Sequence, residues 1–314
     1  MNRSYVLYAA GQNYIDHLRM VVEYLLKISK YHVILCYAEG SVDYADPRLI
    51  TIKMDIPYLI DFNVKSHDPK NVRRQYLLTY KPNVCEAALL NTQFDEFLYI
   101  DADIIVTPNI EKMCDDWSKR CTEYPLFSRY CSDEFYVEGR KLVLDKILNL
   151  RNISRKNQSV VPVTTALFFF NRKCFSFIQE WVSFVHSQEY IDAFVKEDGL
   201  GNKELAQYND EQGANVLMWY HGYDRYIGPM VWTSLAKCVE YVLNAYKVSV
   251  PLILHPHHKN EHGFTHGRTP LEYAYPYQDD TSIFPVNKWD LFAFHSIKDA
   301  EEYKMGVKYI EQLY

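Results

Sequence analysis

The chain has 314 residues, of which 48% are hydrophobic and 24% are charged, and its formal net charge is −6 with a sequence pI near 6.0. This length suits one large α/β domain or two small ones, and the hydrophobic share is sufficient for a full core. The acidic balance and the lack of any Lys/Arg-rich block argue against a general nucleic-acid-binding protein.

The cysteine content and the apolar runs bear on the cellular compartment. The seven cysteines are an odd number, and no two of them have CxxC spacing. Reduced thiols in a cytosolic protein are the simplest interpretation. The N-terminus carries no apolar region typical of a signal peptide, and no apolar stretch reaches 18 residues. We therefore expect a soluble, cytoplasmic protein.

Short apolar runs alternate with stretches of helical period along the first half of the chain. In chain order, the sequence predicts a strand at 4–10, a helix at 13–29, strands at 32–38 and 48–54, a helix at 81–93, a strand at 97–106 and a helix at 107–120. The second half is less regular, with a strand at 161–171, helices at 173–190 and 209–220, and a terminal helix at 298–314. This order predicts an α/β fold, namely a mostly parallel, twisted sheet with helices on both faces, in a single domain.

Two aspartates interrupt the strongest apolar run, FLYIDADIIV. Asp101 and Asp103 are two residues apart, so on a strand they share one face. They are expected at or just past the carboxyl end of a buried strand, outside which the ligands of open α/β sheets bind. Carboxylates this close would repel each other unless a cation lay between them, and oxygen ligands with a diphosphate suit Mg²⁺ or Mn²⁺. The alternative is a strand end whose acids face solvent.

The segment FDEFLYIDADIIVTPN, including Asp95, resembles the Asp-x-Asp strand of nucleotide-sugar glycosyltransferases of the GT-A type. The nearest subgroup is the retaining type that includes glycogenin and the bacterial lipooligosaccharide galactosyltransferases. The resemblance extends over residues 4–260, but it is confined to separate segments. It implies a Rossmann-like catalytic domain over 1–314, with a nucleotide-binding half at 1–120 and an acceptor-facing, metal-completing half at 121–314. Asp101 and Asp103 would bind Mn²⁺ or Mg²⁺ together with the diphosphate of the donor, which by family habit is a UDP-sugar.

Two further matching segments concern the nucleotide. YVLYAAGQNYIDHL resembles the first strand and loop of the family, which implies that Ala9, Ala10 and Tyr14 lie at the nucleotide. An ordinary βα turn is an equally good interpretation. The family often carries a basic residue on a helix that faces the diphosphate, and Lys81 in TYKPNV is near that place, with Arg74 as a rival. Either could instead be a solvated surface cation.

The segments that match the family's sugar-binding residues come later in the chain. In VPVTTALFFFN, Thr164 and Ala166 replace an Asn and a Gly of the family's acceptor-side strand. NDEQGANVL resembles the family's Asp-Gln-x-x-x-Asn segment, with Glu211, Gln212 and Asn215 at the matching places. The resemblance implies that Gln212 lies near the anomeric carbon and that Glu211 binds the donor sugar. Glu211 could instead be the general base of an inverting reaction, or simply an acid at a helix N-terminus.

A late histidine often completes the metal site of such enzymes. VSVPLILHPHHKN offers His255, with His257 close behind and Lys259 able to meet the diphosphate as a point charge. His295 in LFAFHSIK is a rival. A zinc site in HPHHKNEHGFTH is a weaker interpretation, because no cysteine lies nearby and the spacing matches no known zinc pattern.

The sequence thus predicts a metal-dependent enzyme that transfers a sugar from a nucleoside diphosphate to a hydroxyl group, with retention slightly preferred. A sugar-nucleotide pyrophosphorylase and a non-catalytic carbohydrate-binding protein of the same fold remain alternatives. The acceptor cannot be deduced, because acceptor pockets are built from variable loops. The aromatic segment 263–289 is either a lid or acceptor loop, or a cover over the sheet.

Overall fold

The computed structural model describes residues 2–56, 77, 79–102, 104–106, 108, 110–129, 145–154, 163–197, 203–205, 210–222, 293–294, 303–304, 307–308 and 311, with the backbone alone at 195–197, 203–205 and 293–294. The first half contains β1 (Arg3–Ala10), α1 (Gln12–Ile28), β2 (His32–Ala38), β3 (Leu49–Lys53), α3 (Lys81–Asn91), β4 (Glu96–Ile100), β5 (Ile105–Val106) and α4 (Ile110–Arg120). The second half contains β6 (Leu126–Arg129), β7 (Val163–Asn171), a 3₁₀ turn (Arg172–Cys174), α6 (Phe175–Val185), α7 (Gln188–Phe194), β8 (Val195–Glu197), β9 (Lys203–Leu205), α8 (Asp210–Tyr220) and β10 (Ala293–Phe294).

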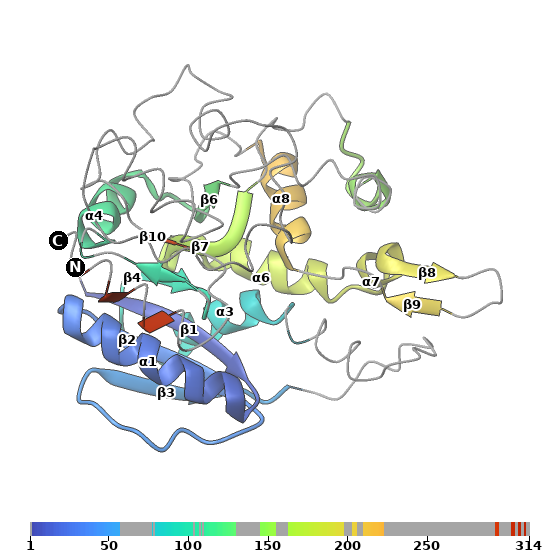
Figure 1. Cartoon of the computed structure of the whole chain (residues 1–314). Helices are drawn as coiled ribbons and strands as arrows, with labels where there is room; N and C mark the ends of the chain where they lie inside the picture. Colours follow the sequence, from blue (N-terminus) through green and yellow to red (C-terminus); the bar gives the residue numbers. More distant parts are fainter. Residues whose placement is uncertain are drawn as a thin grey trace, which may run out of the picture.

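Six of these strands form one sheet in the order β3-β2-β1-β4-β7-β6 (Figure 1). β1 pairs in parallel with β2 and with β4, and β2 pairs in parallel with β3. β7 is antiparallel to both of its neighbours, β4 and β6. The expected α/β class with a mostly parallel sheet is therefore confirmed. The chain builds outward from β1 to β3 on one side and places β4 on the other, so the strand order reverses between β1 and β4, where open α/β sheets bind ligands.

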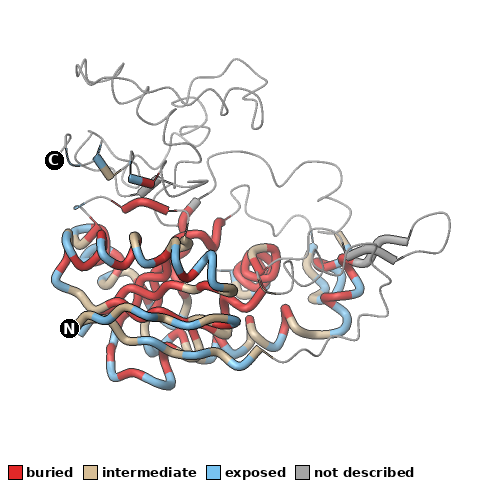
Figure 2. The backbone as a smooth tube through the Cα atoms, turned by 60° about the horizontal axis from the view of Figure 1, so that its bottom comes forward, coloured by how far each residue is buried: buried red, intermediate tan, exposed pale blue. Residues whose placement is uncertain are grey.

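Helices cover both faces of the sheet, as expected. Adjacent residues of β7 point to opposite faces, and their rings show which helices lie there. Phe169 meets Trp117 of α4 at a centroid distance of 6.3 Å, whereas Phe168 meets Trp181 of α6 at 5.7 Å. β4 is buried at all five positions, and the central strands are mostly red in Figure 2. Burial on both faces explains why these strands are continuous apolar runs rather than alternating ones.

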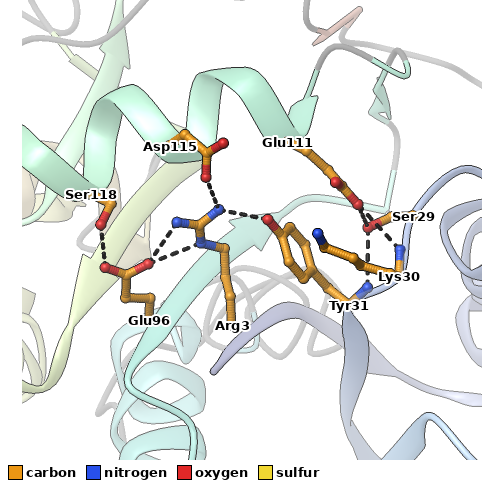
Figure 3. A network of polar contacts seen from close by, with 8 residues as sticks. All are labelled: Arg3, Ser29, Lys30, Tyr31, Glu96, Glu111, Asp115 and Ser118. Atoms are coloured by element: carbon orange, nitrogen blue, oxygen red, sulfur yellow. Dashed lines mark hydrogen bonds and ion pairs between the residues drawn. The ribbon is translucent and has the colours of Figure 1, made fainter. Parts of the chain in front are cut away.

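A network of polar side chains lies at the amino ends of β1 and β4, and we call it the amino-edge network (Figure 3). The Nε and Nη2 atoms of Arg3 donate to Glu96 Oε2 at 3.0 and 2.7 Å. Its Nη1 atom donates to Tyr31 Oη at 2.8 Å and to Asp115 Oδ1 at 3.0 Å. Ser118 donates to the other oxygen of Glu96. The side chains of Arg3 and Glu96 are only 5% and 7% exposed, so this is a buried ion pair in which every guanidinium nitrogen donates a hydrogen bond.

Two expected elements are interrupted. The strand expected at 97–106 ends at Ile100, and β5 belongs to another sheet, where it pairs with β10. A continuous strand would bury the carboxylate of Asp101 between the layers at a large desolvation cost, so the chain turns instead. The helix expected at 173–190 is a 3₁₀ turn followed by α6 and α7. Its break has a local cause, because Ser187 Oγ accepts from Tyr190 N at 3.2 Å and caps a new helix.

The remaining expectations about secondary structure concern the last part of the chain. The described residues of the expected terminal helix, 303–304, 307–308 and 311, are helical. The segment 263–289 lies outside the described residues. Within the described ranges, no helix is long and apolar enough to cross a lipid bilayer.

Candidate active site at the carboxyl edge of the sheet

Asp101 follows β4 directly, at the carboxyl edge of the sheet and next to the point where the strand order reverses. Its backbone N–H donates to the carbonyl oxygen of Ala166 in β7 at 2.8 Å, which fixes the place where the chain leaves the sheet. Its side chain is 24% exposed, so the carboxylate is accessible from outside the fold. Its predicted partner Asp103 lies outside the described residues.

Lys81, the first residue of α3, points its ammonium group at Asp101. Nζ lies 3.0 Å from Asp101 Oδ1 and 3.1 Å from Oδ2. Nζ also donates to the backbone carbonyl of Thr165 at 3.0 Å and to its hydroxyl oxygen at 3.2 Å. Burial by itself would lower the pKa of Lys81, but the charges of Asp101 and Asp210 outweigh it and raise the pKa above its ordinary value. Lys81 is therefore a buried, permanently charged cation and not a solvated surface lysine.

Asp210 is the member of this site that the sequence analysis missed. It is the first residue of α8, it is 4% exposed, and its Oδ2 atom lies 3.8 Å from Lys81 Nζ. This Oδ2 atom has no hydrogen-bond partner among the described residues. Burial raises the pKa of Asp210, and the charge of Lys81 opposes that rise. A carboxyl group in the first turn of a helix is so common that its position alone gave no signal.

Glu211 follows Asp210 and is anchored to β7. Its Oε2 atom accepts a hydrogen bond from the backbone N–H of Thr165 at 3.3 Å. We call Lys81, Asp101, Asp210 and Glu211 the carboxyl-edge cluster. Within the cluster, Asp101 and Asp210 lie next to Lys81, and the charge of Glu211 also acts on its ammonium group. Three carboxyl groups and one ammonium group leave an excess of negative charge that a bound cation would reduce.

Asn215 and Gln212 also lie on α8, but they are more deeply buried than Glu211. Asn215 Oδ1 accepts from Val163 N at 2.8 Å, and Nδ2 donates to Val163 O and to Glu211 O, each at 2.9 Å. These bonds attach α8 to β7 and hold the start of the helix against the sheet. Gln212 is 2% exposed, whereas Glu211 is partly exposed. In β7, Thr164 and Ala166 are both buried.

The residues expected at the nucleotide lie at the carboxyl end of β1. Ala9 is buried with 2% exposure, so its backbone is the part that could face a ligand, and Ala10 is half-buried. Gly11 follows with φ 93° and donates to the carbonyl oxygen of Ala38 at 2.9 Å, which ends the strand. Tyr14 in the first turn of α1 is 51% exposed, so its ring is available for stacking. Their role at a nucleotide stays a prediction.

Several predicted site residues lie outside the described residues, namely Arg74, Asp103, His255, His257, Lys259 and His295. In the described part of the chain, no three His, Cys, Asp or Glu side chains form a metal-type cluster. The carboxyl-edge cluster nevertheless fits a hard divalent cation, because Asp101 offers an accessible carboxylate within a surplus of negative charge. Oxygen ligands of this kind suit Mn²⁺ or Mg²⁺.

No protein-family model and no curated protein matches this chain. Among solved structures, the chain is similar to the galactosyltransferase LgtC in complex with donor and acceptor sugar analogues. The sequence identity is 13% and the TM-score 0.47, over 98% of this chain and 95% of that chain. An active-site mutant of LgtC, in which a glutamine is replaced by glutamate, gives 13% identity and a TM-score of 0.46 over 99% and 94% of the two chains. A likeness at this level carries no argument about activity, so function must be argued from the residues of the site.

Proposed function

We propose that the protein is a metal-dependent glycosyltransferase that moves a sugar from a nucleoside diphosphate sugar to a hydroxyl group of a glycan or of a protein-linked acceptor. One observation carries this proposal: Asp101 stands at the carboxyl end of a central strand, with the buried cation Lys81 at 3.0 Å. An accessible carboxylate beside a fixed ammonium group, at the strand reversal of an α/β sheet, suits a metal–diphosphate group.

The main requirement of such a transfer is to stabilise the negative charge that builds up on the departing diphosphate. A bound Mn²⁺ or Mg²⁺ would neutralise the charge that builds up on it. Lys81 supplies a positive charge that hydrogen bonds to Thr165 already hold in place, so little reorganisation is needed during the reaction. In this proposal Asp103 and His255 complete the metal site, and Lys259 adds a second cation.

The sugar lies toward the start of α8. The bond from Thr165 N–H orients Glu211, which is exposed enough to accept a hydrogen bond from a sugar hydroxyl. Gln212 faces the anomeric carbon in this proposal, with retention of configuration slightly preferred. If the reaction instead inverts, Glu211 takes the proton of the acceptor hydroxyl. Ala9, Ala10 and Tyr14 hold the base, which we take to be uracil from the family resemblance.

The cytoplasm is the proposed location. The described cysteines 36, 85, 114, 121 and 174 are all free thiols. Reduced cysteines are typical of cytosolic proteins.

The test is release of nucleotide from a panel of UDP-, GDP- and dTDP-sugars, with Mn²⁺ and with a chelator. We expect one sugar nucleotide to release its diphosphate in Mn²⁺ only, and Asp101→Asn to lower the rate by about 100-fold or more. Asp95→Asn is the matched control, because Asp95 is an exposed aspartate that directly precedes the opposite end of β4. Diphosphate formation from a nucleoside triphosphate and a sugar phosphate would instead identify a pyrophosphorylase. Metal-independent sugar binding without turnover would identify a carbohydrate-binding protein.

A further inference from the structure

A side chain of α1 contacts the backbone between the two aspartates. His17 Nε2 lies 3.0 Å from the carbonyl oxygen of Ala102. A carbonyl oxygen only accepts hydrogen bonds, so the contact requires that His17 carry its proton on Nε2. The first helix of the chain therefore holds the peptide that joins Asp101 to the second aspartate.

A second side chain of α1 also contacts the segment that follows Asp101. Tyr24, two helical turns after His17 and on the same face, donates its hydroxyl to the carbonyl oxygen of Val106 at 2.7 Å. Tyr303 packs edge-on against both rings, at centroid distances of 5.8 Å from His17 and 6.2 Å from Tyr24, and is 2% exposed. His17 and Tyr24 thus hold the two ends of the stretch from Ala102 to Val106.

The two sides of the turn are held by different partners. Asp101 is fixed by the sheet and by Lys81, and its carbonyl oxygen accepts from Ile104 N at 3.1 Å. The oxygen of Ala102 is held by His17. Because a peptide unit is planar, fixing this oxygen also restrains the backbone of Ala102, the residue that directly follows Asp101.

We propose that His17 is a positioning residue for the metal–diphosphate site, an inference that rests on the proposed function. By donating to Ala102, it holds the turn that directly follows Asp101, and so keeps the carboxylate of Asp101 where a cation can meet it. Partners of this kind behind a metal ligand change metal affinity by about 10- to 100-fold. His17 touches neither the metal nor the substrate in this account.

Three substitutions of His17 separate this role from simple packing. His17→Gln places an amide N–H at the reach of Nε2, His17→Asn places it one bond short, and His17→Ala removes it. Tyr24→Phe is the control, because it removes the neighbouring bond to Val106 and leaves the Ala102 contact intact. For each variant, three quantities are measured: the dissociation constant of UDP in saturating Mn²⁺, the melting temperature, and hydrogen exchange of the amides from 101 to 106.

We expect His17→Ala and His17→Asn to weaken UDP binding in Mn²⁺ by about 10-fold or more and to speed exchange in the turn, whereas His17→Gln stays within about 2-fold of wild type. Tyr24→Phe should lower the melting temperature without changing the dissociation constant. Wild-type affinity in His17→Ala, or equal losses in the Gln and Ala variants, would overturn the positioning role while leaving the proposed function in place. If the wild-type protein binds no nucleoside diphosphate, the proposed function fails and this role fails with it.

Discussion

The two ends of the central sheet treat buried charge in opposite ways. At the amino edge, Arg3 pairs with the buried Glu96 and with the exposed Asp115, and each of its guanidinium nitrogens donates a hydrogen bond. At the carboxyl edge, Lys81 is shared between Asp101 and Asp210, and Asp210 Oδ2 has no hydrogen-bond partner among the described residues. Buried polar groups in native structures are normally satisfied, so an unmatched group calls for an explanation. The amino edge is closed, whereas the carboxyl edge leaves negative charge for a ligand to neutralise.

Both the amino edge and the carboxyl edge are formed by the same two strands, β1 and β4. β1 begins at Arg3 and ends at Ala10, and β4 begins at Glu96 and ends just before Asp101. One sheet therefore separates a stabilising contact from the proposed binding site along the length of its strands. The comparison predicts that substitutions at the amino edge change stability alone, and that substitutions at the carboxyl edge change binding.

The largest expected effect is the loss of the buried arginine. Arg3→Met leaves the carboxylate of Glu96 buried without its cation, which costs about 3–5 kcal/mol of unfolding free energy. Urea unfolding measures this loss. The UDP affinity of the folded fraction should not change. The double variant Arg3→Met/Glu96→Leu removes both charges and should recover most of the stability. If the unfolding free energy of the single variant falls by less than about 1 kcal/mol, the ion pair of Arg3 and Glu96 contributes little to stability.

A smaller effect is expected at Lys81. Lys81→Met removes a charged hydrogen-bond donor worth about 1.5–3 kcal/mol, which corresponds to a UDP affinity about 10- to 100-fold weaker by calorimetry. It also destabilises the fold, because Asp101 and Asp210 lose their counter-charge. Adding Asp210→Asn should restore stability but not affinity. If the double variant recovers both, Lys81 is a structural cation like Arg3 and the contrast between the edges disappears.

The smallest effect concerns the flank of the carboxyl edge, where His186 packs against the start of α3. Its Nε2 atom lies 2.7 Å from Asn83 Oδ1, and its ring lies 5.1 Å from that of Tyr80. Burial lowers the pKa of His186 from 6.5 to about 4. The unfolded chain therefore takes up a proton first on acidification, so this stability is present above pH 6.5 and is lost as the pH falls toward 4.

From pH 7 to pH 5, this group should lower the unfolding free energy by about 1–2 kcal/mol. Denaturant unfolding at the two pH values measures the change, and His186→Gln should flatten the profile by the same amount. An unchanged slope in the variant would mean that other groups carry the acid sensitivity.

The sequence was most informative where a local pattern has one structural solution. The apolar run before Asp101 predicted a buried strand ending in a carboxylate, and β4 is such a strand. The family resemblance suggested Lys81, with Arg74 as a rival, as the basic residue near the site, and Lys81 lies beside Asp101. Asp210 was missed, because its partner Lys81 is distant in the sequence and only the fold brings them together. Arg3 and Glu96 were missed for the same reason. The pairing of β5 in another sheet was also missed, since the apolar residues after Asp103 fit a continued strand as well as they fit β5.

The most direct test of the account is a calorimetric titration of UDP into the wild-type protein, Asp101→Asn and Asp95→Asn, each with and without Mn²⁺. We expect the wild-type and Asp95→Asn proteins to bind UDP only when Mn²⁺ is present, and Asp101→Asn to lose affinity by about 100-fold or more. Equal affinity in the two variants, or binding that does not depend on metal, would contradict the claim that the carboxyl edge of this sheet is a metal–diphosphate site.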